Sequence, residues 1–358
     1  MRLVKTEDAV GQVLCHDMTQ IIPGIKKGPV FPKGHIVTKE DIPVLLSIGK
    51  EHLYVWELAD EEAGLVHENE AALILRDICM GGSASLTASE PSEGKIEIRA
   101  AADGLFKVDG KRMKRLNSLG DLMIATIHGN FPVKRGDKLA GTRIIPLVIE
   151  RERMEEAKRK AGKAPLFSIL PFHHTKVTII TTGNEVALGR IQDGFGPVLK
   201  EKLSEYDTEV VSQRILPDDR EQIKEAVLKA AYEGTELILV TGGMSVDPDD
   251  KTPGAIKDTG AEIVSYGAPV LPGAMFLLSY LSVNGKRSDG KEHRIPVLGL
   301  PGCIMYARRT IFDLILPRVL AGEELTAEDI NVYGEGGLCL NCEVCHFPHC
   351  AFGKVSGV

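Results

Sequence analysis

The segment Ile238–Ile256 combines a short apolar run with glycines and carboxylates, which are residue types suited to binding a phosphate and its metal. The run Ile238–Val240 leads directly into Thr241-Gly242-Gly243. Three aspartates then follow within four positions, namely Asp247, Asp249 and Asp250. A glycine turn after a strand lets backbone N–H groups approach an anion, and aspartate oxygens are ligands that Mg²⁺ prefers. The segment therefore predicts a loop that binds a phosphorylated ligand.

Two other apolar runs end in a glycine turn of the same kind. Thr182–Glu185 follows Val177–Thr181, and Pro301–Cys303 follows Ile295–Leu300. If the three runs are parallel strands of one sheet, their turns share the edge at which such sheets bind ligands. The candidate ligand contacts on these turns are Thr182, Gly183, Asn184, Thr241, Gly242, Gly243, Met244, Ser245, Asp247, Pro301 and Gly302.

Carboxylates on neighbouring loops extend this candidate site. Glu185 and either Asp218 or Asp219 would join Asp250 as catalytic groups, and Asp249 and Asp250 would hold the metal. The chain contains no GxxxxGK[ST] phosphate loop, no dinucleotide fingerprint and no recognisable Ser-His-Asp order. The alternative is a set of ordinary strand-to-helix turns with solvated aspartates. We favour Mg²⁺ bridging between carboxylates and phosphate oxygens.

The elements that must position these turns alternate between strand and helix. Strands are predicted at 177–181, 208–216, 236–240, 275–281 and 295–300, and helices at 198–206, after Asp218 or Asp219, at 252–259 and at 303–320. This alternation predicts an α/β domain with a mostly parallel sheet and helices on both faces.

The rest of the chain divides into smaller predicted parts. They are a β-rich module (1–60), an α+β module (61–150), a charged linker (151–174), the α/β domain (175–325) and a cysteine-rich tail (326–358). A formal net charge of −7 over 358 residues does not indicate the excess of basic residues that is typical of nucleic-acid-binding proteins. The polar N-terminus and the lack of an 18-residue apolar run predict no membrane contact and a cytoplasmic location.

Six motifs in order carry a resemblance to a known family. They are TTGNEV, GRIQDGFGPVLKEKL, LPDDREQI, TGGMSVDPDD, LPGAMFLL and GLPGCIMYARRTIFDLILPRVL, within residues 175–320. This set resembles the molybdopterin-binding fold of molybdopterin molybdenumtransferases, and residues 61–150 loosely resemble their N-terminal region. The resemblance implies a three-layer fold, molybdopterin or its adenylated form and molybdate as ligands, Mg²⁺ as cofactor, and a homodimer. It adds Asp193, Pro272 and Gly273 to the candidate pterin contacts.

The resemblance leaves three functions open. The first is molybdate insertion into adenylated molybdopterin, with Asp250 and Asp218 or Asp219 handling the metal. The second is a carrier or sensor of the molybdenum cofactor that serves a molybdoenzyme or a biosynthetic partner. This alternative is favoured by departures from the family pattern, such as Cys303 in the GLPGNP-type turn and the missing NSAMDGYA-type loop. The third is nucleotide pyrophosphate cleavage of the competence-damage type.

The tail carries a separate metal signal. Cys339, Cys342, Cys345 and Cys350 have C-x2-C-x2-C-x4-C spacing. Seven cysteines in all, an odd number, fit reduced thiols better than a disulfide framework. The spacing predicts either zinc or an iron–sulfur cluster, and the alternative is a redox-sensitive tail without metal.

Overall fold

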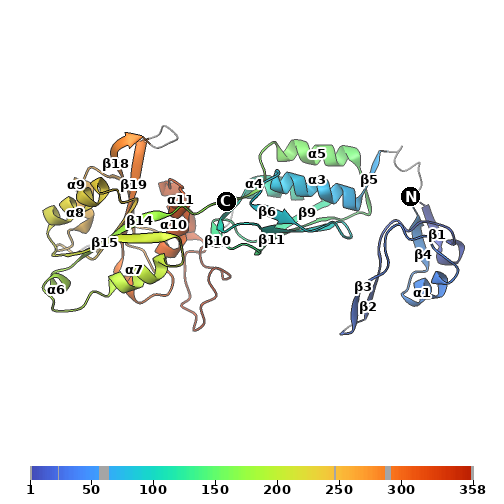
Figure 1. Ribbon diagram of the computed structural model, residues 1–358, viewed down its shortest axis with the longest axis horizontal. Helices are drawn as coiled ribbons and strands as arrows, with labels where there is room; N and C mark the ends of the chain where they lie inside the picture. The colour runs from blue at the N-terminus through green and yellow to red at the C-terminus, as the bar shows by residue number, and fades with distance from the viewer. Residues whose placement is uncertain (1, 23, 56–63, 246, 287–291, 356–358) are drawn as a thin grey trace. The chain divides into compact units, whose positions relative to one another are not determined.

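The computed structural model describes the chain apart from residues 1, 23, 56–63, 246, 287–291 and 356–358 (Figure 1). The described residues form two compact units. Unit 1 comprises residues 1–101, 109–127 and 135–168, and unit 2 comprises residues 102–108, 128–134 and 169–358. The predicted limit between residues 60 and 61 lies outside the described residues, and the predicted domain limits stay predictions.

Unit 1 begins with short antiparallel pairs. Strand β1 (Arg2–Lys5) pairs with β4 (His52–Val55), and β2 (Met18–Ile22) pairs with β3 (Lys26–Phe31). A 3₁₀ turn η1 (Thr6–Asp8) and helix α1 (Asp41–Ser47) complete this part. Its small core contains Leu14, Met18, Val37, Leu45 and Leu53.

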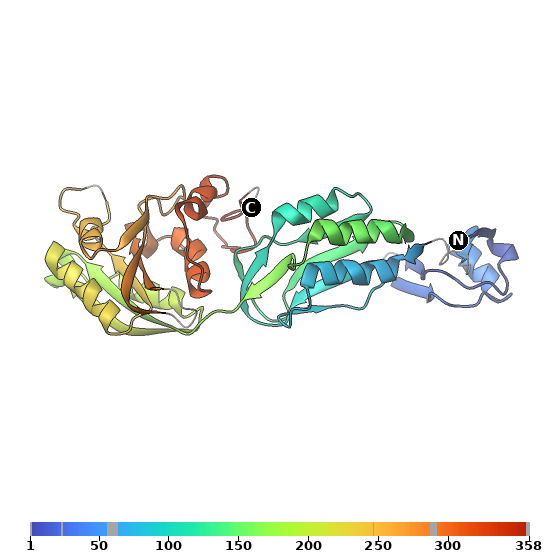
Figure 2. The ribbon, with the colours of Figure 1, turned by 90° about the horizontal axis from the view of Figure 1, so that it is seen from above.

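The remainder of unit 1 is a four-stranded antiparallel sheet covered by helices. The sheet order is β6 (Leu86–Ala88), β7 (Lys95–Ala100), β11 (Lys138–Ile144) and β9 (Leu122–Thr126), with a separate pair β5 (Leu65–His67) and β12 (Val148–Glu150). Helix α3 (Glu68–Met80) packs on β7 and β11, and α4 (Gly110–Asn117) packs on β9. Figure 2 shows α3 and α5 (Arg151–Ala161) side by side over this sheet.

The charged segment predicted as a linker forms regular structure. Helix α5 buries Met154, Ala157 and Ala161 on one face, and its charged residues face solvent or form ion pairs. Strand β13 (Phe167–Leu170) follows and pairs in the order β10 (Phe131–Val133), β8 (Gly104–Val108), β13. The division between units 1 and 2 therefore falls within β13, between Ser168 and Ile169.

Unit 2 is built on a six-stranded sheet. Its order is β15 (Thr208–Leu216), β14 (Thr175–Thr182), β16 (Leu237–Thr241), β19 (Glu292–Leu300), β18 (Leu277–Lys286) and β17 (Glu262–Tyr266). The first four strands are parallel, and β18 and β17 are antiparallel to their neighbours. The predicted α/β fold with a mostly parallel sheet is confirmed, although β17 was not predicted.

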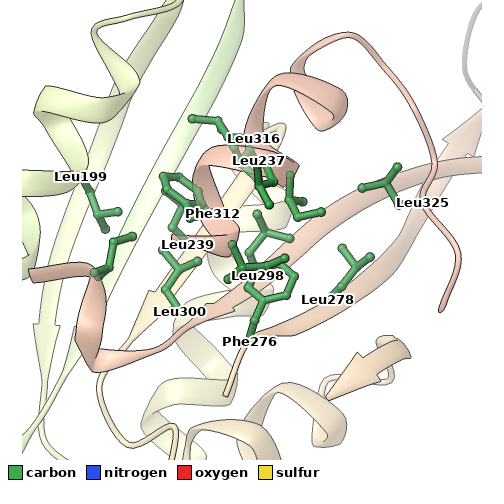
Figure 3. Packing of buried hydrophobic residues seen from close by; sticks show 14 of the residues in the cluster. Leu199, Leu237, Leu239, Phe276, Leu278, Leu298, Leu300, Phe312, Leu316 and Leu325 are labelled. Carbon is green, nitrogen blue, oxygen red and sulfur yellow. The ribbon is translucent and has the colours of Figure 1, made fainter. Parts of the chain in front are cut away.

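Helices cover both faces of this sheet because its strands are apolar on both sides. On β16, Leu237 and Leu239 face one core and Ile238 and Val240 face the other. The first core is closed by α7 (Phe195–Leu203) and α10 (Ile311–Leu320), whose Leu199, Phe312 and Leu316 surround Leu239 and Leu298 in Figure 3. The second core is closed by α8 (Arg220–Tyr232) and α9 (Thr252–Asp258). The domain therefore has the predicted three layers.

The prediction of one long helix over 303–320 is wrong. A 3₁₀ turn η2 (Gly302–Met305) comes first, and α10 begins only at Ile311. Thr310 and Asp313 form a capping box, which fixes the start of the helix there. Helix α11 (Ala327–Asn331) and η3 (Val332–Gly334) follow. None of the helices in the described ranges is long and apolar enough to cross a membrane.

Candidate functional site

The three glycine turns lie on one edge of the unit 2 sheet. Thr181 of β14 is in register with Thr241 of β16, and Thr241 is in register with Leu300 of β19. Since the three strands are parallel neighbours, the turns that follow them emerge side by side. This arrangement confirms that the sheet brings the predicted turns together, at the edge where open α/β sheets bind ligands.

Gly242 allows the turn after β16 to pass close to the end of β14. Its φ of +85° lies in the left-handed region, and a Cβ there would stand 2.0 Å from the carbonyl oxygen of Thr182. A hydroxyl pair holds the same crossing, because Thr252 Oγ1 donates to Gly242 O (2.8 Å) and lies 3.2 Å from Thr182 Oγ1. Only glycine fits this position, since any side chain would push the two turns apart.

Aspartates of the loop that follows β16, called here the TGG loop after Thr241-Gly242-Gly243, form hydrogen bonds inside that loop. Asp250 Oδ2 accepts a hydrogen bond from the Ser245 amide at 2.6 Å, and the Asp250 amide donates to Asp247 O at 2.9 Å. Tyr266 Oη donates to Met244 O at 3.0 Å. Burial, followed by the nearby Asp250 carboxylate, raises the pKa of Tyr266, so the phenol stays a donor at neutral pH. The loop is thus closed on itself before any ligand binds.

Two backbone amides of this loop are left as donors. Within the described part of the chain, the N–H groups of Gly243 and Met244 donate no hydrogen bond. Asp250 Oδ2 accepts from the next amide, that of Ser245, and Asp250 lines the same cleft as Gly243 and Met244. Adjacent amide donors with one carboxylate fit an anionic ligand that carries a divalent cation.

A cleft of about 700 Å³ opens over these groups. Its lining includes nine of the predicted residues, namely Gly242, Gly243, Met244, Ser245, Asp250, Pro272, Gly273, Pro301 and Gly302. Gly273 is needed here because a Cβ would stand 2.5 Å from the Ile311 side chain and its φ is +131°. The turns after β16 and β19 and the loop before β18 therefore build one cavity.

Other predicted residues lie outside that lining. They are Thr182, Gly183, Asn184, Glu185, Asp193, Asp218, Asp219, Thr241, Asp247 and Asp249. Several of them support turns instead. Asn184 and Asp218 exchange two hydrogen bonds of 3.0 and 3.3 Å, and Asp219 caps α8 by accepting from the Gln222 amide. Asp193 accepts from the amides of Phe195 and Gly196 and so starts α7.

The cleft has walls that the sequence did not indicate. They are Leu271, Ala274, Met275, Cys303 and Tyr306, together with Leu338, Cys339 and Asn341 of the tail. The tail reaches the cleft through backbone pairing, since Leu271 N donates to Gly337 O and Cys339 N donates to Leu271 O, both at 2.8 Å. No periodic or motif signal marks such a contact between segments so far apart in the chain, so only the structure could reveal it.

Cys303 does not begin a helix, although a helix was predicted over residues 303–320. It lies in the 3₁₀ turn η2, and α10 begins only at Ile311. Burial raises the pKa of its thiol, so the neutral form predominates at neutral pH. Cys303 is therefore best described as a small, half-buried residue that fills this turn.

No group of three or more His, Cys, Asp or Glu side chains within the described ranges is arranged around one point as a metal would require. The four tail cysteines are free thiols, with Cys342 and Cys345 exposed. The cleft supplies one carboxylate, that of Asp250. Because Mg²⁺ is commonly held by one or two carboxylates plus the phosphates of a substrate, this set fits Mg²⁺ arriving with a ligand.

Comparisons with known proteins concern mainly the α/β domain. Residues 178–321 match the family described as "Probable molybdopterin binding domain", and residues 3–57 match a domain of unknown function, DUF8806. The molybdopterin molybdenumtransferase of Synechococcus elongatus is 29% identical over 170 residues, covering 45% of this chain and only 38% of that protein. The molybdopterin adenylyltransferase of Pyrococcus furiosus is 27% identical over 155 residues, covering 42% of this chain and 85% of that protein.

Other matches are shorter or structural. CinA-like proteins of Mycobacterium species match over 74 residues, for example at 38% identity over 21% of this chain and 18% of the relative. A solved structure of the molybdopterin biosynthesis enzyme MoaB from Thermus thermophilus is 24% identical, with a TM-score of 0.32, covering 42% of this chain and 98% of that one. The α/β domain of this chain therefore matches the molybdopterin-binding domain found in proteins of molybdenum-cofactor biosynthesis.

Proposed function

We propose that the cleft binds adenylated molybdopterin and that the chain inserts molybdate into it in a Mg²⁺-dependent reaction. The observation that carries this proposal is the pairing of two amide donors, on Gly243 and Met244, with the carboxylate of Asp250 on one loop of the cleft. An acid beside anion-binding amides disfavours a bare phosphate and favours one that arrives with a cation.

Each part of the cleft has a role in this proposal. The two amides hold a phosphate of the ligand, as strand-end glycine turns do in other α/β folds. Asp250 would hold Mg²⁺, and the ion would supply charge neutralisation at the phosphate of the leaving nucleotide. Side chains with apolar surface on the cleft walls, among them Met244, Leu271 and Tyr306, would contact the pterin face.

A carrier or sensor function is the second candidate, and one specific observation favours it. Three carboxylates assigned a catalytic role, Glu185, Asp218 and Asp219, lie outside the cleft lining. Asp218 and Asp219 already hold turns through hydrogen bonds of 3.0 and 2.9 Å. Of the four predicted catalytic acids, Asp250 alone lines the cleft. One carboxylate is enough to bind a ligand with its cation, but it leaves fewer side chains to catalyse a reaction.

The two candidates are separated by one assay. Purified protein is mixed anaerobically with adenylated molybdopterin, Mg²⁺ and molybdate, and AMP release is followed together with reconstitution of an apo-molybdoenzyme. Insertion predicts AMP release that needs molybdate and is lost in Asp250→Asn. Asp219→Asn, which alters a helix cap outside the cleft, should retain the reaction at wild-type rate per folded molecule.

Two results would contradict insertion. Tight binding of the adenylated ligand, with AMP release no greater than in Asp250→Asn, would leave the carrier function. Cleavage of ADP-ribose without any pterin would instead indicate a nucleotide pyrophosphatase of the kind considered for the competence-damage relatives.

A further inference from the structure

Four cysteines of the tail line one cavity of unit 2. Cys339, Cys342, Cys345 and Cys350 fall within twelve residues, and all are free thiols. Together with His346 they contribute to the wall of a cavity of about 340 Å³. The chain is neither helix nor strand from residue 339 to 350. The fold therefore brings four thiols and an imidazole to the same small space.

Contacts at both ends fix this loop on the body of unit 2. At its start, the Cys339 amide donates to Leu271 O at 2.8 Å. At its end, Phe347 packs edge-on against Phe131 with ring centroids 5.7 Å apart, and Phe352 is 3% exposed. Only a short stretch between these contacts would have to order around a ligand, so the entropic cost of closing it is small.

Two of the four tail cysteines do not serve as core residues, whereas Cys339 and Cys350 are half-buried and pack against the core of unit 2. Unpaired structural cysteines are usually buried as small apolar groups, as Cys79 is in α3 at 0% exposure. Cys342 and Cys345 are exposed instead, and the aromatic residues Phe347 and Phe352 supply the packing. Three thiols at successive C-x2-C spacing, two of them exposed and none in a disulfide, are best explained as metal ligands.

We propose that Cys339, Cys342, Cys345 and Cys350 form a thiolate metal site in this cavity, occupied by zinc or by an iron–sulfur cluster. The thiols share the cavity but do not yet converge on one point, as no metal-binding group is formed within the described residues. Metal binding would draw the loop together, and each thiol would release its proton on becoming a thiolate ligand.

The site would adjoin the candidate molybdopterin cleft. Tyr306, Leu338, Cys339 and Asn341 line both cavities. Loading the tail with metal would therefore fix one wall of that cleft. The metal site itself does not depend on which function the cleft performs.

Metal content is the first test. The full chain is purified anaerobically as wild type, as the double variant Cys342→Ser/Cys345→Ser, and as Cys79→Ala, a control that removes a thiol in unit 1. Wild type and Cys79→Ala should carry either about one zinc ion per chain, without colour, or iron and acid-labile sulfide in equal amounts with visible absorption. The double variant should lose the metal, and because both positions are exposed it should keep the melting temperature of metal-free wild type.

A second readout covers protein that is isolated without metal. Zinc alone, or iron with sulfide under reducing conditions, is added to the wild type, and thiols are labelled with a maleimide and mapped by mass spectrometry. Protection of the four tail cysteines, with no change at Cys303, supports the site. Equal metal in the wild type and the double variant, or no metal and no protection after both additions, would overturn it.

Discussion

Replacing Gly242 by alanine tests the close approach of the turn after β16 to the end of β14. The new Cβ would stand 2.0 Å from Thr182 O in a residue whose φ is +85°. A left-handed conformation costs a non-glycine residue about 1–2 kcal/mol, and the steric overlap adds about 1–3 kcal/mol as the backbone shifts. The free energy of unfolding should fall by roughly 2–5 kcal/mol, which lowers the melting temperature of unit 2 by about 5–15 °C.

The matched control is Gly302→Ala. Gly302 lines the same cleft, but its φ is not in the left-handed region and a Cβ there meets no atom within 4 Å. Calorimetry should show a melting temperature close to that of the wild type. If Gly242→Ala also melted within a degree of the wild type, the contact between the turn after β16 and the end of β14 would be wrong.

Three further predictions concern single side chains of unit 2. Lys202 Nζ lies 2.7 Å from Oδ1 of buried Asp313, so Lys202→Met removes one partner of a buried carboxylate. The free energy of unfolding should fall by about 3 kcal/mol. A loss below about 1 kcal/mol in urea titrations would contradict this prediction. Thr241→Val should leave the free energy of unfolding unchanged or raise it by about 1 kcal/mol, because the buried hydroxyl has no hydrogen-bond partner among the described residues. A clear loss of stability in the same titrations would mean that the hydroxyl does have a partner. Iodoacetamide should modify exposed Cys342 before half-buried Cys303. The rate of alkylation of Cys303 should keep rising with pH above about 8.5, because burial raises the pKa of its thiol. Rapid labelling of Cys303 at neutral pH would contradict a buried thiol.

The architecture of unit 2 followed from local patterns. Apolar runs such as Leu237–Thr241 are buried on both faces, so their order along the chain with intervening helices already implies a parallel sheet. The shared edge of the turns then follows from strand direction alone. The start of α10 did not follow, because the capping box of Thr310 and Asp313 competes with an apolar pattern that begins several residues earlier.

The site was only partly predictable for a physical reason. Residue type shows that a carboxylate can bind metal, but not which partner it already has. Asp218 and Asp219 look like Asp250 in the sequence, yet Asp219 caps a helix and Asp218 holds a neighbouring turn. The approach of Cys339 to the cleft depends on a backbone pairing with Leu271, which leaves no pattern in either segment.

The most direct test of the account is an anaerobic crystal structure of the chain with molybdopterin. We predict that the ligand occupies the cleft between the turns after β16 and β19, with a phosphate oxygen within hydrogen-bond distance, about 3 Å, of the amides of Gly243 and Met244. A pterin bound elsewhere on unit 2, or a phosphate held by the turn after β14 instead, would contradict the assignment of this cleft.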